Sequence, residues 1–340
     1  KQASSGGGDF RHSPQRRGSA ASVCGMCRAQ VGQRASGWAN RTTQSSQTGC
    51  AGQARHTPHW LGSVVIARVS RSRNIESIYS RRRRPEGAQT FMPPEHPPTI
   101  DPLAARRWAR TAPPLSPWLH EEVARRMEDR LQWIKLQPTR WAHWTPVRGG
   151  LQTHGLLTRR YPNSECFVVE TEKKYKQLAI KSIVKPWWNP SGRKTRTTRF
   201  EMPPDTSVQM LWANMVLHDA ADPEALIAQW HRALMTDGFL MFSCLGPDTL
   251  RELRGLYGAL GWPPPGHEFT DMHDWGDMLV HAGFAEPVMD MERITLTYET
   301  PARLLLDLRE LGRNLHPARF AALRGRRWRQ HLEHEMAERL

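Results

Sequence analysis

A turn at residues 140–150 (RWAHWTPVRGG) stands where a nucleotide-binding unit places its cofactor loop. A helix-like stretch follows at 151–162 and a strand-like segment at 167–170, so the local order is strand, turn, helix and strand. Such turns use small glycines because no Cβ then obstructs the ligand, and the amides at the start of the helix bind anionic groups. Gly149 and Gly150 are the glycines of this turn, and we expect them to contact a cofactor.

Two other groups of side chains have the composition of metal sites. Cys24 and Cys27 form a CxxC pair, but the spacing of the cysteine and histidines that follow is irregular. His267 and His273 lie near Asp271 in the sequence, and a capped helix start explains the aspartate equally well. We therefore expect no metal site. The chain also shows no Ser/His/Asp or Cys/His arrangement typical of nucleophilic catalysis.

The elements that must position these residues alternate between helix and strand. Apolar residues at helical spacing, together with start and stop signals, predict helices at 117–137, 173–184, 223–235, 271–284 and 301–313. Apolar runs predict strands at 208–213, 238–244 and 288–298. The uncharged strand 238–244 is typical of a parallel sheet covered on both faces. This order predicts a doubly wound, mostly parallel α/β fold that is Rossmann-like and binds ligands at the carboxyl ends of its strands.

Composition divides the chain into three parts. Residues 1–91 hold 15 Lys/Arg against 3 Asp/Glu, whereas the remainder holds 33 against 30, so most of the formal charge of +15 lies in this first segment. Its low apolar content predicts a disordered basic tail, and we expect the natural coding sequence to begin at Met92. Residues 92–117 are proline-rich and predict an extended lead-in. Residues 118–340 form the folded domain, which ends inside a helical pattern, so we expect a truncated C-terminus that lacks a terminal strand.

The composition also limits the partners. The four arginines at 81–84 could attract nucleic acid or anionic lipid, but the nearly neutral body makes nucleic-acid binding unexpected except through the tail. No apolar run reaches the roughly 18 residues that span a bilayer. Cys166 and Cys244 lie in apolar strands with no disulfide framework, which is typical of a reducing compartment. We expect a cytoplasmic monomer with no membrane partner.

Four motifs from residue 208 onward resemble a known family. The motifs are VQMLWANMVLHD (208–219), FSCLGPDTLRELR (242–254), FTDMHDWGDMLVHAGF (269–284) and DMERITLTY (290–298). In order and spacing they resemble the malonyl-acyl-carrier-protein O-methyltransferases of biotin synthesis, which are class I methyltransferases dependent on S-adenosyl-L-methionine. The resemblance covers about 101–340. An arginine-hydroxylating assembly factor of a mitochondrial respiratory complex shares much of the pattern, so kinship alone does not fix the chemistry.

The turn departs from the pattern of the resembled family. Members carry an acid and then Gly-x-Gly-x-Gly after the first strand, whereas here His143 or Trp144 stands near the acid and only Gly149 and Gly150 remain. Two interpretations stay open. The loop binds the cofactor through its glycines and the helix start, or the indole rings of RWAHWTPV fill the pocket and exclude it.

The resemblance also implies residues beyond the turn. It places Glu170 on the ribose hydroxyls, Gln209 in the position of the fourth-strand acid and Asn214 beside cofactor or acceptor. His218, shortly after that strand, is a candidate for the acceptor side. Glu201 lies loosely near the place of the adenine-side acid.

Methyl transfer to a carboxylate is a direct displacement at a sulfonium, and the carboxylate is already ionised at neutral pH, so no general base is required. The acceptor side needs cations for the malonyl carboxylate and the acidic carrier. Arg309 and Arg313 are the candidates, with Arg303 weaker, although a solvated helix face would explain all three. The alternative function is an inactive pseudo-methyltransferase that serves as a binding or assembly module.

Overall fold

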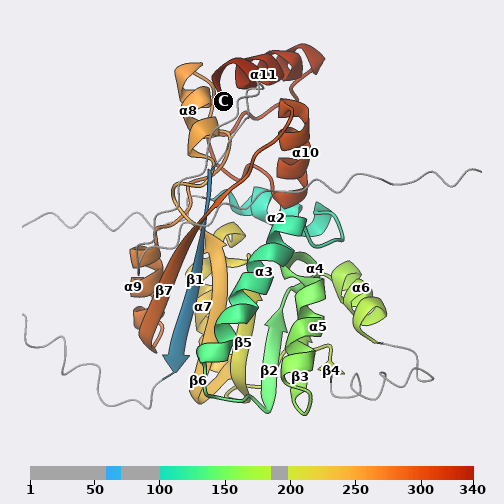
Figure 1. The fold of residues 1–340 in the computed structure, drawn as a ribbon, viewed down its shortest axis with the longest axis vertical. Helices are drawn as coiled ribbons and strands as arrows, with labels where there is room; N and C mark the ends of the chain where they lie inside the picture. The colour runs from blue at the N-terminus through green and yellow to red at the C-terminus, as the bar shows by residue number, and fades with distance from the viewer. Residues whose placement is uncertain (1–58, 70–99, 185–197) are drawn as a thin grey trace, which may run out of the picture.

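The computed structural model describes residues 59–69, 100–184 and 198–340 (Figure 1). Seven strands form one sheet in the order β4-β3-β2-β5-β6-β1-β7. Their bounds are β1 His59–Val69, β2 Arg140–Trp144, β3 Glu165–Val169, β4 Thr198–Arg199, β5 Val208–Asn214, β6 Leu234–Leu245 and β7 Phe284–Thr295. Strands β2 to β6 pair in parallel, and β1 pairs antiparallel with both β6 and β7. The predicted α/β fold with a mostly parallel sheet is confirmed.

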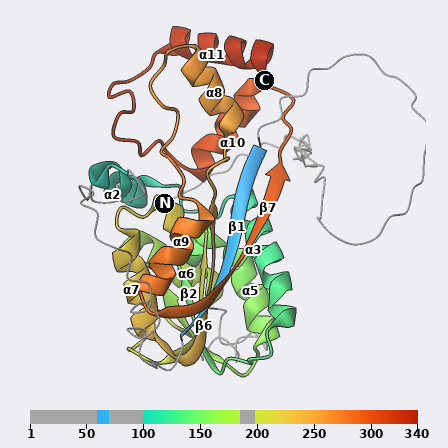
Figure 2. The ribbon, with the colours of Figure 1, turned by 90° about the vertical axis from the view of Figure 1, so that its left-hand side faces the viewer.

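Helices cover both faces of this sheet (Figure 2). One face packs against α7 (Pro223–Ala233) and α9 (Met272–His281), where Trp230 and Trp275 are fully buried. The other face packs against α3 (Trp118–Arg130), α5 (Leu151–Arg160) and α6 (Lys173–Ile183). The strands between them are apolar on both sides because neither face meets water.

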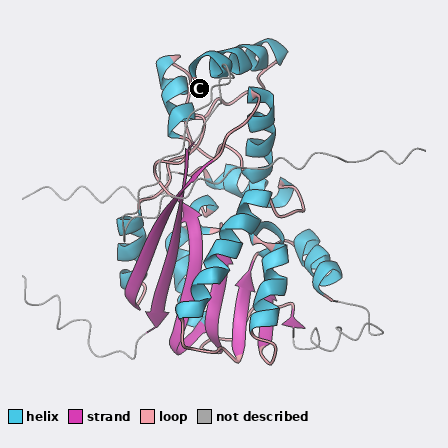
Figure 3. Ribbon diagram, in the orientation of Figure 1, coloured by secondary structure: helices cyan, strands magenta, loops and turns pink. Residues whose placement is uncertain are grey.

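A helical cap lies beyond the carboxyl ends of the parallel strands (Figure 3). It consists of α8 (Arg251–Ala259), α10 (Pro301–Leu311) and α11 (Arg326–Arg339), which share one apolar cluster with the start of α3. A segment without helix or strand, residues 312–325, joins α10 to α11. The cap and the strand ends therefore enclose the edge of the sheet where ligands are expected, and we call this edge the carboxyl edge.

The most informative difference from prediction is β1. We predicted a disordered tail through residue 91, and this is wrong for residues 59–69, which form a strand between β6 and β7. Val65 and Ala67 are fully buried there, and the pairing runs from Gly62 opposite Leu245 to Arg68 opposite Phe239. The sheet thus takes its antiparallel strand from a part of the chain that precedes Met92. The apolar run was visible, but its partners lie far away in the sequence.

The proline-rich lead-in also differs from prediction. Residues Pro102–Thr111 form α2, with the Asp101 side chain accepting hydrogen bonds from the amides of Leu103 (2.8 Å) and Ala104 (3.3 Å). This N-cap and the proline at the first turn start a helix in a segment expected to be extended. The helix predicted at 117–137 is observed as α3 (Trp118–Arg130), and no side chain caps its first turn.

Other start and stop signals are confirmed. Asp222 caps α7 through the amide of Ala225 (2.9 Å), and Asp271 caps α9 through the amide of His273 (2.9 Å). Gly283 follows α9 with a φ of 97°, the left-handed backbone that favours glycine. No helix in the described ranges is long and apolar enough to cross a membrane. The CxxC pair and the arginines at 81–84 lie outside the described residues.

Candidate active site

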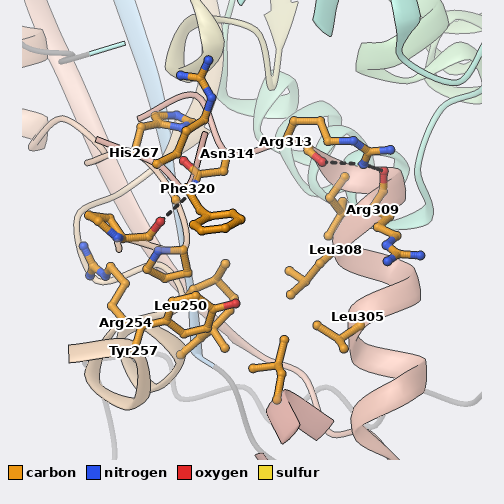
Figure 4. Close-up of a pocket in the computed structure, with 18 of the residues that line it drawn as sticks. Leu250, Arg254, Tyr257, His267, Leu305, Leu308, Arg309, Arg313, Asn314 and Phe320 are labelled. Carbon is orange, nitrogen blue, oxygen red and sulfur yellow. Dashed lines mark hydrogen bonds between the residues drawn. The ribbon is translucent and has the colours of Figure 1, made fainter. Parts of the chain in front are cut away.

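A cavity of about 670 Å³ lies between the carboxyl edge and the cap (Figure 4). Its walls are mainly apolar, with Leu250 and Tyr257 from the α8 side facing Leu305 and Leu308 of α10. The 312–325 segment, including Phe320, lines a further side of the cavity. The size and composition suit an organic group with an apolar body and a polar end.

Arginines supply the positive charge of this cavity. Arg309 and Arg313 at the end of α10, which we predict to bind the acceptor, both line it, and in the described residues neither guanidinium has a carboxylate within 4 Å. Arg313 donates to the carbonyl of Gly312 (3.0 Å) and lies 5.0 Å from the Trp108 ring. Arg303 does not line the cavity; it pairs with Asp307 at 3.3 Å on the same helix. Arg303 is thus paired with a carboxylate outside the cavity, whereas Arg309 and Arg313 have room to bind an anion within it.

Histidines form the polar floor of the cavity. His218, His120 and His267 line it, together with Asp219. His267 Nε2 lies 3.0 Å from the carbonyl oxygen of His218, so this nitrogen carries the proton and donates. Burial lowers the pKa of His218 to about 4, although nearby Asp219 opposes the shift, and burial lowers the pKa of His120 to about 3. The histidines of this floor are therefore uncharged at neutral pH.

Backbone strain collects at the carboxyl edge. In the described residues, six non-glycine residues have positive φ, and three of them follow β2, β5 and β6: Thr145 (47°), Met215 (55°) and Leu250 (55°). Left-handed backbone in such residues costs about 1–3 kcal/mol each and is commonly kept at functional sites. Of these three, Met215 and Leu250 also line the cavity.

The predicted cofactor turn folds as a short helix, α4 (Pro146–Gly149), pressed onto the end of β5. A Cβ on Gly149 would lie 2.7 Å from the Asn214 carbonyl oxygen. Gly150 has a φ of 131°, and a Cβ there would lie 3.1 Å from the Ala124 Cβ of α3. Both glycines are thus required by close packing within the protein, whatever they bind.

Asn214 is placed differently from prediction. Its side chain is fully buried and donates to the carbonyls of His120 (2.9 Å) and Gly149, while its oxygen accepts from the Ser243 hydroxyl (2.6 Å). Every hydrogen-bonding group of this amide is satisfied by the protein. In the described structure Asn214 joins α3, α4 and β6 instead of facing a ligand.

Glu121 of α3 occupies the start of α5. Its carboxylate accepts from the amides of Gln152 (3.0 Å) and Thr153 (3.3 Å) and from the Thr153 hydroxyl (3.4 Å). These are the amides that an anionic cofactor group would use. Sequence reasoning missed Glu121 because the contact joins residues about thirty positions apart.

The ribose contact predicted for Glu170 stays a prediction, and the structure places this residue beside the cofactor turn. It follows β3, is half-buried, and accepts from the Val147 amide at 2.8 Å. Burial raises its pKa to about 7, and the Val147 hydrogen bond opposes that shift. A carboxyl group beside the cofactor turn with spare acceptor capacity fits a pair of ribose hydroxyls.

The indole rings of the turn do not fill the pocket. Trp144 packs edge-on against Trp230 of α7 (centroids 6.0 Å), within the core on one face of the sheet. Trp141 lies in the core on the other face and donates to the Ser164 hydroxyl at 2.8 Å. The interpretation that indoles plug the site is therefore wrong, and the group that meets the helix amides is Glu121.

Gln209 and Glu201 are not at the carboxyl edge. The Gln209 side-chain oxygen accepts from the Thr139 hydroxyl (2.9 Å), just before β2 begins, so it lies at the opposite edge of the sheet. The prediction that Gln209 binds the cofactor is wrong in this structure, because a residue at the start of a parallel strand lies at its amino end. Glu201 is exposed and lies 3.7 Å from Arg199. In the described ranges no group of three or more His, Cys, Asp or Glu could hold a metal ion.

The sheet and cavity define a doubly wound α/β protein with a cavity at its carboxyl edge. No model of a known protein family matches the chain. Among curated proteins, the malonyl-[acyl-carrier protein] O-methyltransferase of Gallionella capsiferriformans is 40% identical over 202 residues, covering 57% of this chain and 68% of that protein. The enzyme of the same name from Laribacter hongkongensis is 37% identical (63% and 74% covered), and that from Nitrosospira multiformis is 34% identical (69% and 82%).

The chain therefore belongs to the malonyl-[acyl-carrier protein] O-methyltransferase family. The resemblance read from the four motifs is confirmed. Among solved structures, a SAM-dependent methyltransferase from Aquifex aeolicus is 12% identical with a TM-score of 0.36, covering 50% of this chain and 88% of that one.

Proposed function

We propose that this protein transfers a methyl group from S-adenosyl-L-methionine to the malonyl carboxylate carried by an acyl carrier protein. The observation that carries the proposal is the cavity at the carboxyl edge. It is apolar, and two arginines without carboxylate partners, Arg309 and Arg313, line its wall in a chain that belongs to a family of this activity.

The residues around the turn fit the cofactor on its ribose side. Glu170 would hold the ribose hydroxyls, and its burial beside the Val147 amide keeps it in place. When bound, the cofactor supplies a methyl group on a positively charged sulfur. On the other side, Glu121 holds the amides of α5, so an anionic cofactor group must displace this carboxylate or bind beside it.

The chain's own contribution to the reaction is alignment and exclusion of water. An ionised carboxylate attacks without losing a proton, so the uncharged His120 and His218 are not needed as bases. Arg309 and Arg313 would hold the malonyl carboxylate, and the apolar walls contributed by Leu250 and Leu308 would surround the thioester. Holding the reactants in line accounts for much of the barrier reduction in such displacements.

The test follows S-adenosylhomocysteine formation with malonyl-carrier and with acetyl-carrier, which lacks the free carboxylate. We expect product with the malonyl form alone. A double Arg309→Gln, Arg313→Gln variant should raise KM by about tenfold or more, because charge-assisted bonds to the acceptor are lost. The control is Arg159→Gln, which changes an exposed arginine on α5. A wild-type chain that neither binds the cofactor nor forms product would favour the inactive binding module instead.

A further inference from the structure

The 312–325 segment lines the cavity and presents apolar side chains to solvent, so we take it as the mouth of the cavity. Leu323 is 100% exposed and Phe320 is 46% exposed, and Ala321 and Ala322 between them are exposed as well. The segment also borders a second hollow of about 420 Å³, which Phe320 and Leu323 line together with Arg107. An exposed apolar group of this kind beside a ligand entrance is typical of an interaction surface.

The same stretch carries a concentrated positive charge. Residues 313–329 include six arginines and neither Asp nor Glu. Arg319 pairs with Asp101 and Arg329 with Glu333, both at 2.7 Å. Arg326 and Arg327, at the first turn of α11, have no carboxylate within 4 Å among the residues that the structure describes. Two guanidiniums at a helix start oppose the helix dipole, so an external anion would relieve an unfavourable arrangement.

Arg324 lies between the exposed apolar group and the cavity. Its guanidinium is 4.0 Å from the Trp328 ring, 4.6 Å from the Phe320 ring and 5.9 Å from the Tyr257 ring. Tyr257 in turn lines the cavity and faces its interior (Figure 4). Stacking on aromatic faces holds the Arg324 charge in one place at the entrance.

We propose that residues 317–327, which we call the docking strap, bind the acyl carrier protein. This inference rests on the proposed function and names the surface that the partner uses. A carrier that is acidic and delivers its acyl group on a flexible arm needs a basic surface beside a narrow entrance. Arg326 and Arg327 would meet its acidic side chains, Leu323 would insert into an apolar depression, and Arg324 would meet the phosphate of the arm.

The apolar content of the strap favours a protein partner. A fully exposed leucine flanked by a half-exposed phenylalanine contributes nothing to phosphate contacts along a duplex, whereas protein interfaces place such anchors at their centre with charged groups around them. Charge complementarity would speed the encounter, and the anchor would slow dissociation.

The experiment measures binding of an unacylated holo carrier to the full chain by fluorescence anisotropy, without any methyl transfer. We expect Arg326→Glu with Arg327→Glu, and separately Leu323→Ser, each to weaken binding by about tenfold or more. The charge-matched control is Arg159→Glu with Lys181→Glu on α5 and α6, both exposed. The apolar control is Val288→Ser on β7, which is 63% exposed. The controls should leave the Kd unchanged.

Three results would overturn the proposal that the docking strap binds the carrier. The wild type does not bind the carrier, or the strap variants bind it as tightly as the controls do. The third is that the wild type binds a short DNA duplex or anionic vesicles more tightly than the carrier. Methyl transfer to malonyl-coenzyme A, a thioester with the same arm and no carrier, is measured in parallel. A chain that binds the carrier but methylates neither thioester refutes the proposed function and leaves the docking strap standing.

Discussion

Gly149→Ala tests the packing of the cofactor turn onto the sheet. The new Cβ would lie 2.7 Å from the Asn214 carbonyl oxygen, which is backbone and is held by the pairing of β5 with β6. The Asn214 side chain also binds the Gly149 carbonyl, so neither segment can move without losing a buried hydrogen bond. Overpacking of this kind costs about 1–3 kcal/mol, and the helix preference of alanine returns less than about 1 kcal/mol.

Gly155→Ala is the matched control in the next helix. A Cβ there meets only the Arg159 Nη1 at 3.6 Å, an ordinary contact with the mobile end of a side chain. Replacing a glycine inside a helix gains about 0.5–1 kcal/mol. Urea unfolding followed by tryptophan fluorescence should therefore move the two midpoints in opposite directions at unchanged slope.

The thermal midpoint offers a second readout of the same pair. For a domain of this size each kcal/mol shifts the midpoint by about 2–4 °C. Gly149→Ala as stable as the wild type would show that α4 does not press against the end of β5. Gly155→Ala as damaging as Gly149→Ala would show that the loss is not specific to the turn.

The remaining predictions concern β1, pH and the cofactor. Val65→Asp should destabilise the fold by about 3–5 kcal/mol in urea unfolding, because it buries an unpaired charge, whereas exposed Arg68→Ala should change it by less than about 0.5 kcal/mol. Buried neutral histidines with lowered pKa values make the unfolded chain bind more protons, so stability should fall as pH falls from about 6.5 towards 4. The pKa of Glu170 is raised, so its protonation in the folded state stabilises the protein as pH falls. This offsets the stability lost through about one of the histidines. The expected net loss between pH 7 and pH 5 is on the order of 3 kcal/mol, and constant stability over that range would refute the burial of these rings. By calorimetry, Glu170→Gln should weaken S-adenosylmethionine binding by about tenfold and Gln209→Ala should leave it unchanged, since the latter lies at the amino edge. Glu121→Ala should tighten cofactor binding by freeing the amides of α5, and weaker binding would contradict that competition.

Much of the fold could be predicted because its signals are local. Cap residues and helical spacing located α7 and α9 within a few residues, and the uncharged run at 238–244 predicted the buried strand β6. The helix α2 was missed because the prolines on either side favoured an extended chain over the Asp101 cap. The strand β1 was missed because its stability comes from pairing with strands more than 160 residues away.

The candidate site was predicted less well because it depends on long-range contacts. Arg309, Arg313 and His218 come together in one cavity, since their positions follow from helix and strand ends, and their binding of the acceptor stays a prediction. The role of Asn214 could not be read from its neighbours, because its partners come from three different elements. The wrong prediction that Gln209 binds the cofactor could have been avoided from the sequence alone. The first residues of a parallel strand lie at the amino edge, away from the ligand side.

The most direct test of the central claim is the intact mass of the carrier protein after incubation with this chain and S-adenosyl-L-methionine. The proposed function predicts that malonyl-carrier gains the mass of one CH2, because a methyl group replaces the acid proton of the malonyl carboxylate, and that ester hydrolysis reverses the gain. Malonyl-carrier of unchanged mass, while S-adenosyl-L-methionine is bound and intact, would contradict the claim.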